Sequence, residues 1–187
     1  MTLNSYLSPE ELSSLGFNKF GINCRISRFA RFYNTSAISI GNNTRIDDFC
    51  IFSPSSSGSI KIGDNVHIAP YSLLSGRELI SIHDHVNISS RVNIYSSSDD
   101  FSGLELPGPQ SQQAFYQPFE SAPIYIASFS IVGSGSVLLP GANLSKGSSI
   151  GALSLVKNTI PPFTVFAGIP AQFLYERKKD FLRSLDV

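Results

Sequence analysis

The 187-residue sequence has little charge, only two cysteines and no tryptophan. Its 14 basic residues are balanced by 14 acidic ones, and no basic block stands out, which argues against nucleic-acid binding. No apolar run reaches the roughly 18 residues that cross a bilayer, so we expect no membrane span. The first 17 residues carry two acids and no base, unlike a secretory signal. Cys24 and Cys50 are too few for a disulfide framework, and we expect reduced thiols in a cytoplasmic protein.

A period of six residues runs through most of the chain. Aliphatic residues recur at every sixth position, and a small residue often follows four places later. Neither the helical period nor the two-residue period of a strand explains this pattern. Gly, Asn, Asp and Ser fill the positions where tight turns need them. The clearest hexads begin at Ile40, Ile46, Ile62, Ile68, Ile82, Ile88, Ile94, Ile126, Val132, Leu144, Ile150 and Val156.

Three such hexads close one coil of a prism, and stacked coils form an all-β solenoid with a continuous aliphatic core. A β-sandwich with frequent turns is the alternative, but it would not keep this phase over so many hexads. We therefore predict a single domain over residues 1–187, with the solenoid at 20–170. A break in the repeat predicts that a long loop leaves the solenoid at about 97–123.

Both ends of the chain carry helix signals. Residues 1–19 are expected to form an N-terminal cap, in which Ser8 and Glu11 make a capping box for a helix at about 9–15. Residues 171–187 place apolar side chains on roughly one face, which predicts a short amphipathic C-terminal helix. The N-terminal helix would cover one open end of the solenoid.

The most specific pattern is the segment VGSGSVLLPGANLSKGSSIGALSLVKNTIPPFTVFAGIPAQFL. It resembles the closing part of the hexapeptide-repeat acyltransferases, in which an IGAGS-type hexad precedes a Pro-rich strand and a Gly-x-Pro-Ala turn. The resemblance covers about residues 20–175 and is closest to galactoside, maltose and polysaccharide O-acetyltransferases. It implies a left-handed parallel β-helix, a homotrimer with active sites between subunits, and acetyl-CoA as the acyl donor.

The family's usual general base is a histidine at the start of the long loop, and the aligned residue here is Asp99. The resemblance also aligns His67, which ends a hexad and is expected at a corner of the prism, with a tyrosine that lines the acceptor site of galactoside-type relatives. We therefore expect His67 to be the base, oriented by Asp99 or Asp100, because an imidazole suits proton abstraction near neutral pH. An aspartate acting alone is the alternative base. Without a catalytic role, His67 is a surface histidine and the aspartates only shape a turn.

No metal is expected. Some hexapeptide proteins resemble γ-class carbonic anhydrases, which gather three histidines around zinc between subunits. His83 and His85 are only two residues apart on one turn, so they fit such a site poorly and are expected to be exposed.

Further binding residues follow from the resemblance by position. Asn87, one coil after His67, and Tyr116, in the aromatic part of the loop, are candidate contacts for the acceptor sugar. The pantetheine arm of the donor is expected against the backbone and small residues of the last coils, at Ser134, Gly135, Ala152 and Leu153. The 3′-phosphate of the donor is expected near Lys157, Arg177 or Lys178, although each of these is equally well explained as a solvated cation.

These expectations describe a cytoplasmic, acetyl-CoA-dependent O-acetyltransferase of bacterial surface polysaccharide synthesis (lipopolysaccharide O-antigen, capsule or exopolysaccharide). The acceptor is expected to be a nucleotide-linked or lipid-linked sugar. Transfer is expected to be direct, because no serine or cysteine sits in an evident nucleophile setting. The first alternative is an N-acetyltransferase on a nucleotide-linked amino sugar; such relatives often carry an N-terminal domain for which this chain has no room. The second is a non-catalytic solenoid that binds or assembles with partners.

Overall fold

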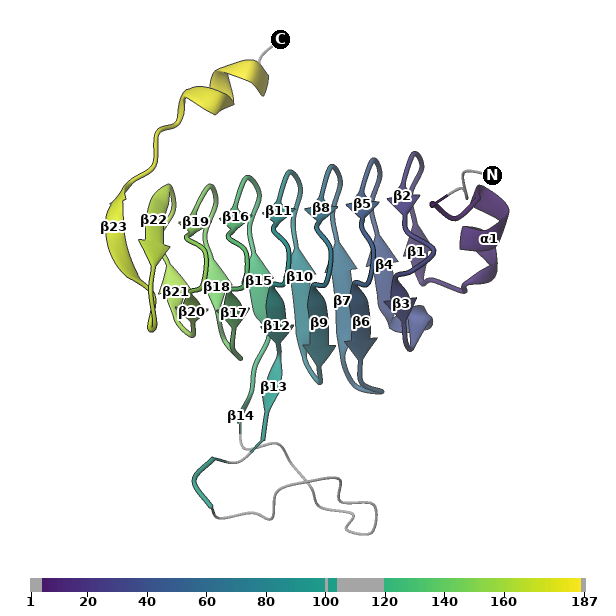
Figure 1. Cartoon of the computed structure of the whole chain (residues 1–187), viewed down its shortest axis with the longest axis horizontal. Helices are drawn as coiled ribbons and strands as arrows, with labels where there is room; N and C mark the ends of the chain where they lie inside the picture. The colour runs from purple at the N-terminus through teal and green to yellow at the C-terminus, as the bar shows by residue number, and fades with distance from the viewer. Residues whose placement is uncertain (1–4, 100, 104–119, 186–187) are drawn as a thin grey trace.

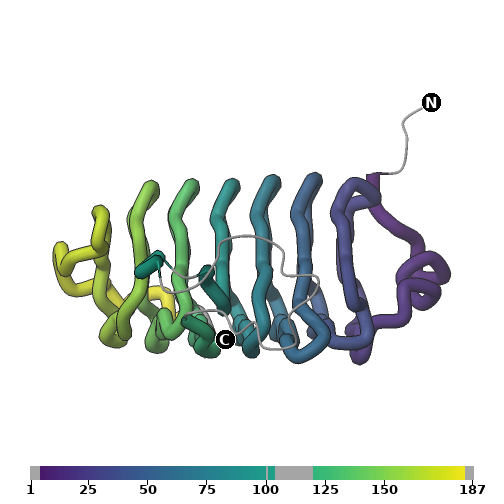
Figure 2. Tube along the Cα trace, turned by 90° about the horizontal axis from the view of Figure 1, so that it is seen from below, coloured from purple at the N-terminus to yellow at the C-terminus, as the bar shows by residue number. Residues whose placement is uncertain are grey.

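The computed structural model describes residues 5–99, 101–103 and 120–185, which form a three-sided parallel β-helix. Its coils lie side by side, from a helix at the N-terminal end to a strand at the C-terminal end (Figure 1). Seen from below, the coils form a row of parallel rungs (Figure 2). The predicted all-β solenoid is therefore confirmed.

The three faces of the prism are three sheets, in which each strand pairs with a strand of the next coil. The first sheet contains β1 (Lys19–Phe20), β4 (Ile38–Ile40), β7 (Ser59–Ile62), β10 (Leu79–Ile82), β15 (Ile124–Ile126), β18 (Asn143–Leu144) and β21 (Thr159–Ile160). The second contains β2 (Arg25–Ile26), β5 (Arg45–Ile46), β8 (His67–Ile68), β11 (Asn87–Ile88), β16 (Ile131–Val132), β19 (Ser149–Ile150), β22 (Thr164–Ala167) and β23 (Gln172–Glu176). The third contains β3 (Arg31–Phe32), β6 (Ile51–Pro54), β9 (Leu73–Gly76), β12 (Asn93–Tyr95), β17 (Val137–Leu138) and β20 (Leu155–Val156).

The first residue of each hexad points inward and forms the core. Within one coil, Ile62, Ile68 and Leu74 come from the three sheets, and all three are buried. Ile62 lies in register with Ile40 of the coil before it and Ile82 of the coil after it. Burying one such side chain contributes about 1.5–3 kcal/mol, so these aliphatic columns are the main source of stability.

The fourth residue of most hexads adopts the left-handed backbone conformation and turns the chain from one sheet to the next. We call the turns from the first to the second sheet the first corner, where these residues are Asn23, Asn43, Asn65, His85, Phe129, Gly147 and Phe163. We call the turns from the second to the third sheet the second corner, where they are Phe49, Tyr71, Arg91, Gly135 and Leu153. Asn and Gly are the expected residues here, whereas the bulky ones were not predicted, because the conformation disfavours a large side chain by about 1–2 kcal/mol.

The predicted N-terminal cap helix is present as α1 (Pro9–Ser14). Its capping box is formed, since the Glu11 amide donates to the Ser8 hydroxyl and the Ser8 amide donates to the Glu11 carboxylate. The Arg28 guanidinium, 2.6 Å from the same carboxylate, lowers the pKa of Glu11 to about 2. Leu12 is the buried residue of this helix, which therefore covers the core at the N-terminal end.

The prediction of a C-terminal helix over 171–187 is wrong for most of its length. Residues 172–176 form β23, which pairs antiparallel with β22, and only η2 (Asp180–Leu185) is a 3-10 helix. The edge of the second sheet offers unpaired backbone groups, and pairing with them outweighs the helical spacing of the apolar residues. Phe173 also packs against Phe166, with ring centroids 5.8 Å apart.

The predicted loop leaves the third sheet after β12. Its base is a two-stranded antiparallel ladder of β13 (Ser97–Ser98) and β14 (Glu120–Ser121), which projects from one edge of the solenoid (Figure 1). Asp100 and Tyr116 lie outside the described residues.

A short 3-10 helix, η1 (Thr35–Ala37), completes the helical elements of the described chain. No helix in that part of the chain is both long and apolar enough to cross a membrane.

Candidate active site

A cavity of about 510 Å³ opens at the base of the loop, against the third sheet. Phe101, Val137 and Leu139 give it an apolar wall. Its other lining residues are polar or amphipathic: Arg77, Tyr95, Ser97, Ser98, Asp99 and Glu120. The cavity therefore combines carboxylates with a hydrophobic surface, as sites for small polar ligands with apolar parts do.

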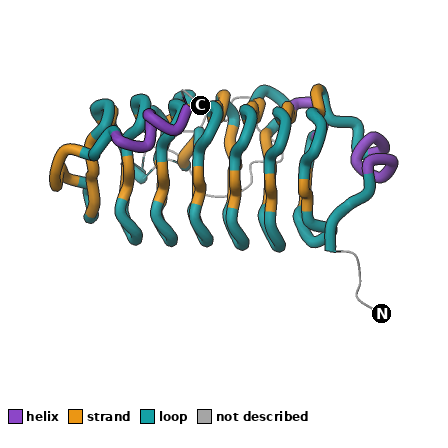
Figure 3. The backbone as a smooth tube through the Cα atoms, turned by 90° about the horizontal axis from the view of Figure 1, so that it is seen from above, coloured by secondary structure: helices purple, strands orange, loops and turns teal. Residues whose placement is uncertain are grey.

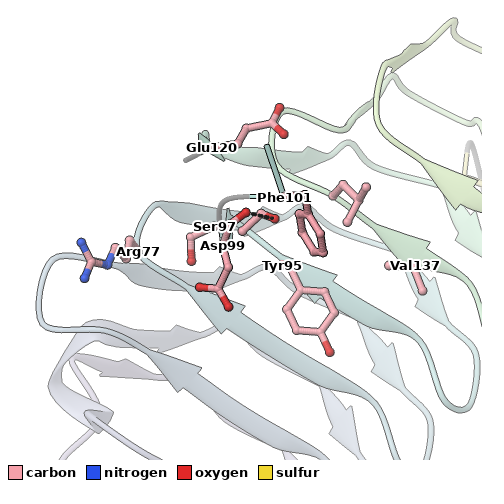
Figure 4. A pocket seen from close by; sticks show the side chains of 9 residues that line it. Arg77, Tyr95, Ser97, Asp99, Phe101, Glu120 and Val137 are labelled. Carbon is pink, nitrogen blue, oxygen red and sulfur yellow. Dashed lines mark hydrogen bonds between the residues drawn. The ribbon is translucent and has the colours of Figure 1, made fainter. Parts of the chain in front are cut away.

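Asp99, the residue at the predicted catalytic position, lines this cavity. Its carboxylate points into the space between Arg77 and Tyr95, whereas the carboxylate of Glu120 points away from them (Figure 4). The ladder that pairs Ser98 with Glu120 fixes the backbone immediately before Asp99. A carboxylate held in this way can accept hydrogen bonds from an amine or a hydroxyl group.

His67 lies on β8 in the second sheet, on a different face of the prism from this cavity. Its Nε2 atom donates to Asp47 Oδ2 at 2.8 Å, and its Nδ1 atom lies 3.0 Å from Asn87 Oδ1. Arg45 Nε in turn donates to Asp47 Oδ1 at 2.6 Å. Arg45, His67 and Asn87 pair directly across β5, β8 and β11, which confirms the predicted register of His67 with Asn87. The prediction that His67 lies at a corner is wrong, because its side chain projects from a strand.

Within the chain, the carboxylate partner of His67 is Asp47 rather than Asp99. The sequence did contain a signal for Asp47, since this residue directly follows the inward Ile46 one coil before His67. Both ring nitrogens of His67 contact protein atoms, whereas a general base needs a lone pair directed at the acceptor. Asp99, and not His67, lines the cavity at the base of the loop.

The predicted donor positions lie together at the second corner. Leu153 N donates to Ser134 O at 2.9 Å, so these two turns stack in adjacent coils. Ser134 and Ala152 are exposed. The Leu153 side chain folds over Gly135, where an added Cβ would lie 2.7 Å from Leu153 Cδ2. These four residues form one strip along the last coils.

The three predicted phosphate-binding cations lie at different places. Lys157 is exposed in the turn from the third to the first sheet, whereas Arg177 and Lys178 line a cavity of about 460 Å³ on the second sheet. The Arg177 guanidinium donates to the carbonyls of Phe129 and Gly147 at 2.6 and 2.9 Å, and burial lowers its pKa. Arg177 therefore ties residues 177–185, called here the C-terminal segment, to the first corner. Lys178 is the better candidate for a phosphate contact.

The cysteines and the remaining histidines have no catalytic setting in the described part of the chain. Burial raises the pKa of the Cys50 thiol to about 11 and also raises that of Cys24, which disfavours the nucleophilic thiolate. His83 and His85 are exposed, and His85 stacks on Phe129. No group of three or more His, Cys, Asp or Glu side chains among the described residues is placed to hold a metal ion.

Known proteins are similar to this chain over most of its length, although no protein-family model matches it. The dTDP-4-amino-4,6-dideoxy-D-glucose acyltransferase of Escherichia coli is 45% identical over 178 residues, which cover 95% of this chain and 92% of that protein. The putative lipopolysaccharide biosynthesis O-acetyl transferase WbbJ of Escherichia coli (strain K12) is 30% identical, covering 81% of this chain and 79% of that protein. The chain belongs to the hexapeptide-repeat acyltransferases.

A solved structure extends this similarity to the fold. AntD, an N-acyltransferase from Bacillus cereus in complex with dTDP and 3-hydroxybutyryl-CoA, is 36% identical, with a TM-score of 0.87 over 99% of this chain and 100% of that chain. A variant of AntD in complex with dTDP-4-amino-4,6-dideoxyglucose and coenzyme A gives a TM-score of 0.91. The agreement confirms both the left-handed β-helix and the assignment of the chain as an acyltransferase.

Proposed function

We propose that this acyltransferase transfers an acyl group from acyl-CoA to the amino group of a dTDP-linked 4-amino-4,6-dideoxy sugar. The observation that carries the proposal is the similarity, over nearly the whole chain, to one enzyme named for that sugar and to an N-acyltransferase bound to dTDP. N-acylation, the first alternative from the sequence, thereby replaces O-acetylation as the preferred reaction. Relatives of this kind often carry an extra N-terminal domain, but this chain matches the whole solved chain of the N-acyltransferase AntD.

The cavity at the loop base supports an amino sugar of this kind. Asp99 offers a carboxylate to the amino group, and the apolar wall of Phe101, Val137 and Leu139 offers a surface to the methyl group of a 6-deoxy sugar. A sugar that keeps its 6-hydroxyl would place that group against an apolar wall, where an unpaired hydroxyl costs about 1–3 kcal/mol.

In the proposed reaction, the amine lone pair attacks the thioester carbonyl and forms the carbon–nitrogen bond. Collapse of the tetrahedral intermediate breaks the carbon–sulfur bond, and the proton lost by the amine ends on the coenzyme A thiol. Asp99 holds the amine in place and relays this proton. A neutral amine is a better nucleophile than a hydroxyl group, so the missing loop histidine fits N-acylation.

The donor is proposed to lie along the second corner, with its pantetheine arm against Ser134, Gly135, Ala152 and Leu153. In this arrangement Lys178 is the candidate contact for a donor phosphate. The homotrimer with active sites between subunits, the cytoplasmic location and any contribution of Asp100 and Tyr116 remain proposals that rest on the family resemblance.

The proposal is tested by measuring thiol release from acetyl-CoA and 3-hydroxybutyryl-CoA with dTDP-4-amino-4,6-dideoxyglucose and with its 4-hydroxy counterpart. We expect turnover of the amino sugar only, and a product that resists mild alkali, as an amide does and an ester does not. Asp99→Asn should lower kcat about 10- to 100-fold, the range for a lost hydrogen bond to a charged group. His67→Gln, the matched control, should stay close to wild type.

Two results would contradict the proposal. Turnover of the 4-hydroxy sugar to an alkali-labile product would restore O-acylation as the function. A large loss of kcat in His67→Gln, with Asp99→Asn unaffected, would restore His67 as the base.

A further inference from the structure

Three aromatic rings form a row along the second corner, in which Phe49 and Tyr71 are stacked, and all three remain open to solvent. The ring centroids of Phe29 and Phe49 are 5.6 Å apart, and those of Phe49 and Tyr71 are 5.0 Å apart. These side chains are 46%, 47% and 55% exposed, respectively. Phe49 and Tyr71 also hold the left-handed backbone conformation, which is unfavourable for a large residue. Burial within the chain therefore does not explain why aromatic residues occupy these turns.

Aromatic residues at the first corner have the same backbone conformation but are covered by the chain itself. Phe129 packs against Phe181 of the C-terminal segment, with ring centroids 5.8 Å apart. Lys179 of the same segment lies over the ring of Phe163. Figure 3 shows this segment lying along the coils. In the described part of the chain, the rings of the second corner have no such cover.

A guanidinium group lies at the open end of this aromatic stack. Arg91, the next residue of the second corner, has its Cζ atom 5.8 Å from the centroid of the Tyr71 ring. The Arg91 side chain is exposed and forms no ion pair with any carboxylate of the described residues. The outer face of Tyr71 and the charge of Arg91 therefore suit a ligand that joins a planar ring to a negative group.

We propose that Tyr71 and Arg91 bind the nucleoside diphosphate part of the acceptor. The base takes the outer face of Tyr71 and becomes the next ring of the stack, while Arg91 moves from that face to the diphosphate. Aromatic side chains bind bases in this way, and arginine forms strong paired hydrogen bonds with phosphate oxygens. The choice of a thymidine nucleotide as ligand rests on the proposed function.

The position of this site relative to the loop cavity supports the proposal. β12 runs across the third sheet from the turn of Arg91 to Tyr95, which lines the cavity. The distance from Arg91 to Tyr95 is at most about 13 Å, because four residues of fully extended chain span that length and Arg91 itself lies in a turn. An arginine side chain, a diphosphate and one pyranose ring together cover this distance. In the proposed arrangement, the nucleotide lies at the second corner and the amino sugar lies in the cavity beside Asp99.

The test measures binding of dTDP alone by titration calorimetry, so that it does not depend on turnover. Tyr71→Ala should raise the Kd for dTDP and for thymidine about tenfold or more, because both lose the stacked base. Arg91→Gln should raise the Kd for dTDP by a similar factor and leave thymidine unchanged. His85→Ala, which alters an exposed residue of the same conformation at the first corner, should bind dTDP like wild type. Tyr71→Ala and Arg91→Gln should both raise KM for the nucleotide sugar with little change in kcat.

The outcomes separate this inference from the proposed function. If wild type acylates the dTDP-linked amino sugar while Tyr71→Ala and Arg91→Gln bind dTDP normally, the nucleotide binds elsewhere and the inference is overturned. If dTDP binding depends on both residues but no amino sugar is acylated, the inference stands and the proposed function fails. If either variant instead changes the sedimentation of the protein and leaves dTDP binding intact, the corner is an interface between copies and the inference is again overturned.

Discussion

The first and second corners make the same turn, with the left-handed backbone conformation at the fourth position of most hexads, but they use large side chains differently. At the first corner, Phe129 and Phe163 are packed under the C-terminal segment. At the second corner, Phe49 and Tyr71 contact each other and remain half exposed. The backbone requirement of the fold is therefore one constraint and the choice of side chain another. When a large residue replaces Asn or Gly in this backbone conformation, contacts with a partner must offset the cost, and that partner lies either within the chain or outside it.

The largest difference in stability should come from two arginines: Arg177, which hydrogen-bonds to the first corner, and Arg91, which belongs to the second. Arg177→Ala removes two hydrogen bonds from a partly buried guanidinium to the carbonyls of Phe129 and Gly147, and should lower the free energy of unfolding by about 2–3 kcal/mol. Arg91→Ala, which removes an exposed cation from the second corner, should change it by less than about 0.5 kcal/mol. Urea denaturation followed by circular dichroism measures both. Equal losses in the two variants would show that the C-terminal segment does not stabilise the first corner.

A second comparison uses the two glycines that lie beside a bulky corner residue. Gly147 and Gly135 have φ values of 71° and 73°, so an alanine costs about 1 kcal/mol at either position for its conformation alone. At Gly147 the new Cβ would lie 2.5 Å from the ring of Phe163, which is half buried. At Gly135 it would meet the end of the Leu153 side chain, which is 71% exposed and free to rotate away.

Gly147→Ala should therefore lower the free energy of unfolding by about 2–3 kcal/mol, against about 1 kcal/mol for Gly135→Ala. Thermal unfolding of the two variants measures the difference. Combining Gly147→Ala with Phe163→Leu should recover part of the loss. No recovery would mean that backbone strain, and not contact with the ring, causes it.

The third comparison replaces a phenylalanine by asparagine at each corner. Phe129→Asn relieves the left-handed backbone but loses the contacts with His85 and Phe181, and should destabilise the protein by about 1–2 kcal/mol net. Phe49→Asn relieves the backbone by the same amount and loses contacts with Phe29 and Tyr71, whose rings are already open to solvent. The gain from the backbone and the loss of these contacts should nearly cancel. Urea midpoints at constant slope test this difference. If Phe49→Asn were the more damaging of the two, the second corner would be part of the stabilising core.

The contrast between repeat and site also explains what the sequence could predict. The hexad period predicted the solenoid, because each aliphatic first residue meets the same requirement for burial in every coil. It also predicted the pairing of His67 with Asn87, because the same strand register repeats from one coil to the next. It did not predict the contact of His67 with Asp47, which depends on how two outward side chains orient across a sheet. Nor did it predict β23, because strand pairing at a sheet edge is a tertiary effect that overrode the helical spacing of Phe173 and its neighbours.

The smallest expected effect concerns the cation that covers the first corner. Lys179 Nζ lies 4.7 Å from the centroid of the Phe163 ring, and at an exposed site such a contact stabilises by about 0.5–1 kcal/mol. Lys179→Met keeps the aliphatic stem and removes only the charge, so it should lower the free energy of unfolding by about 0.5 kcal/mol. A double-mutant cycle with Phe163→Leu isolates the pair, because the loss should vanish once the ring is gone. A loss that persists without the ring would place the contribution of Lys179 in general electrostatics, and the cover of the first corner would then rest on Arg177 and Phe181.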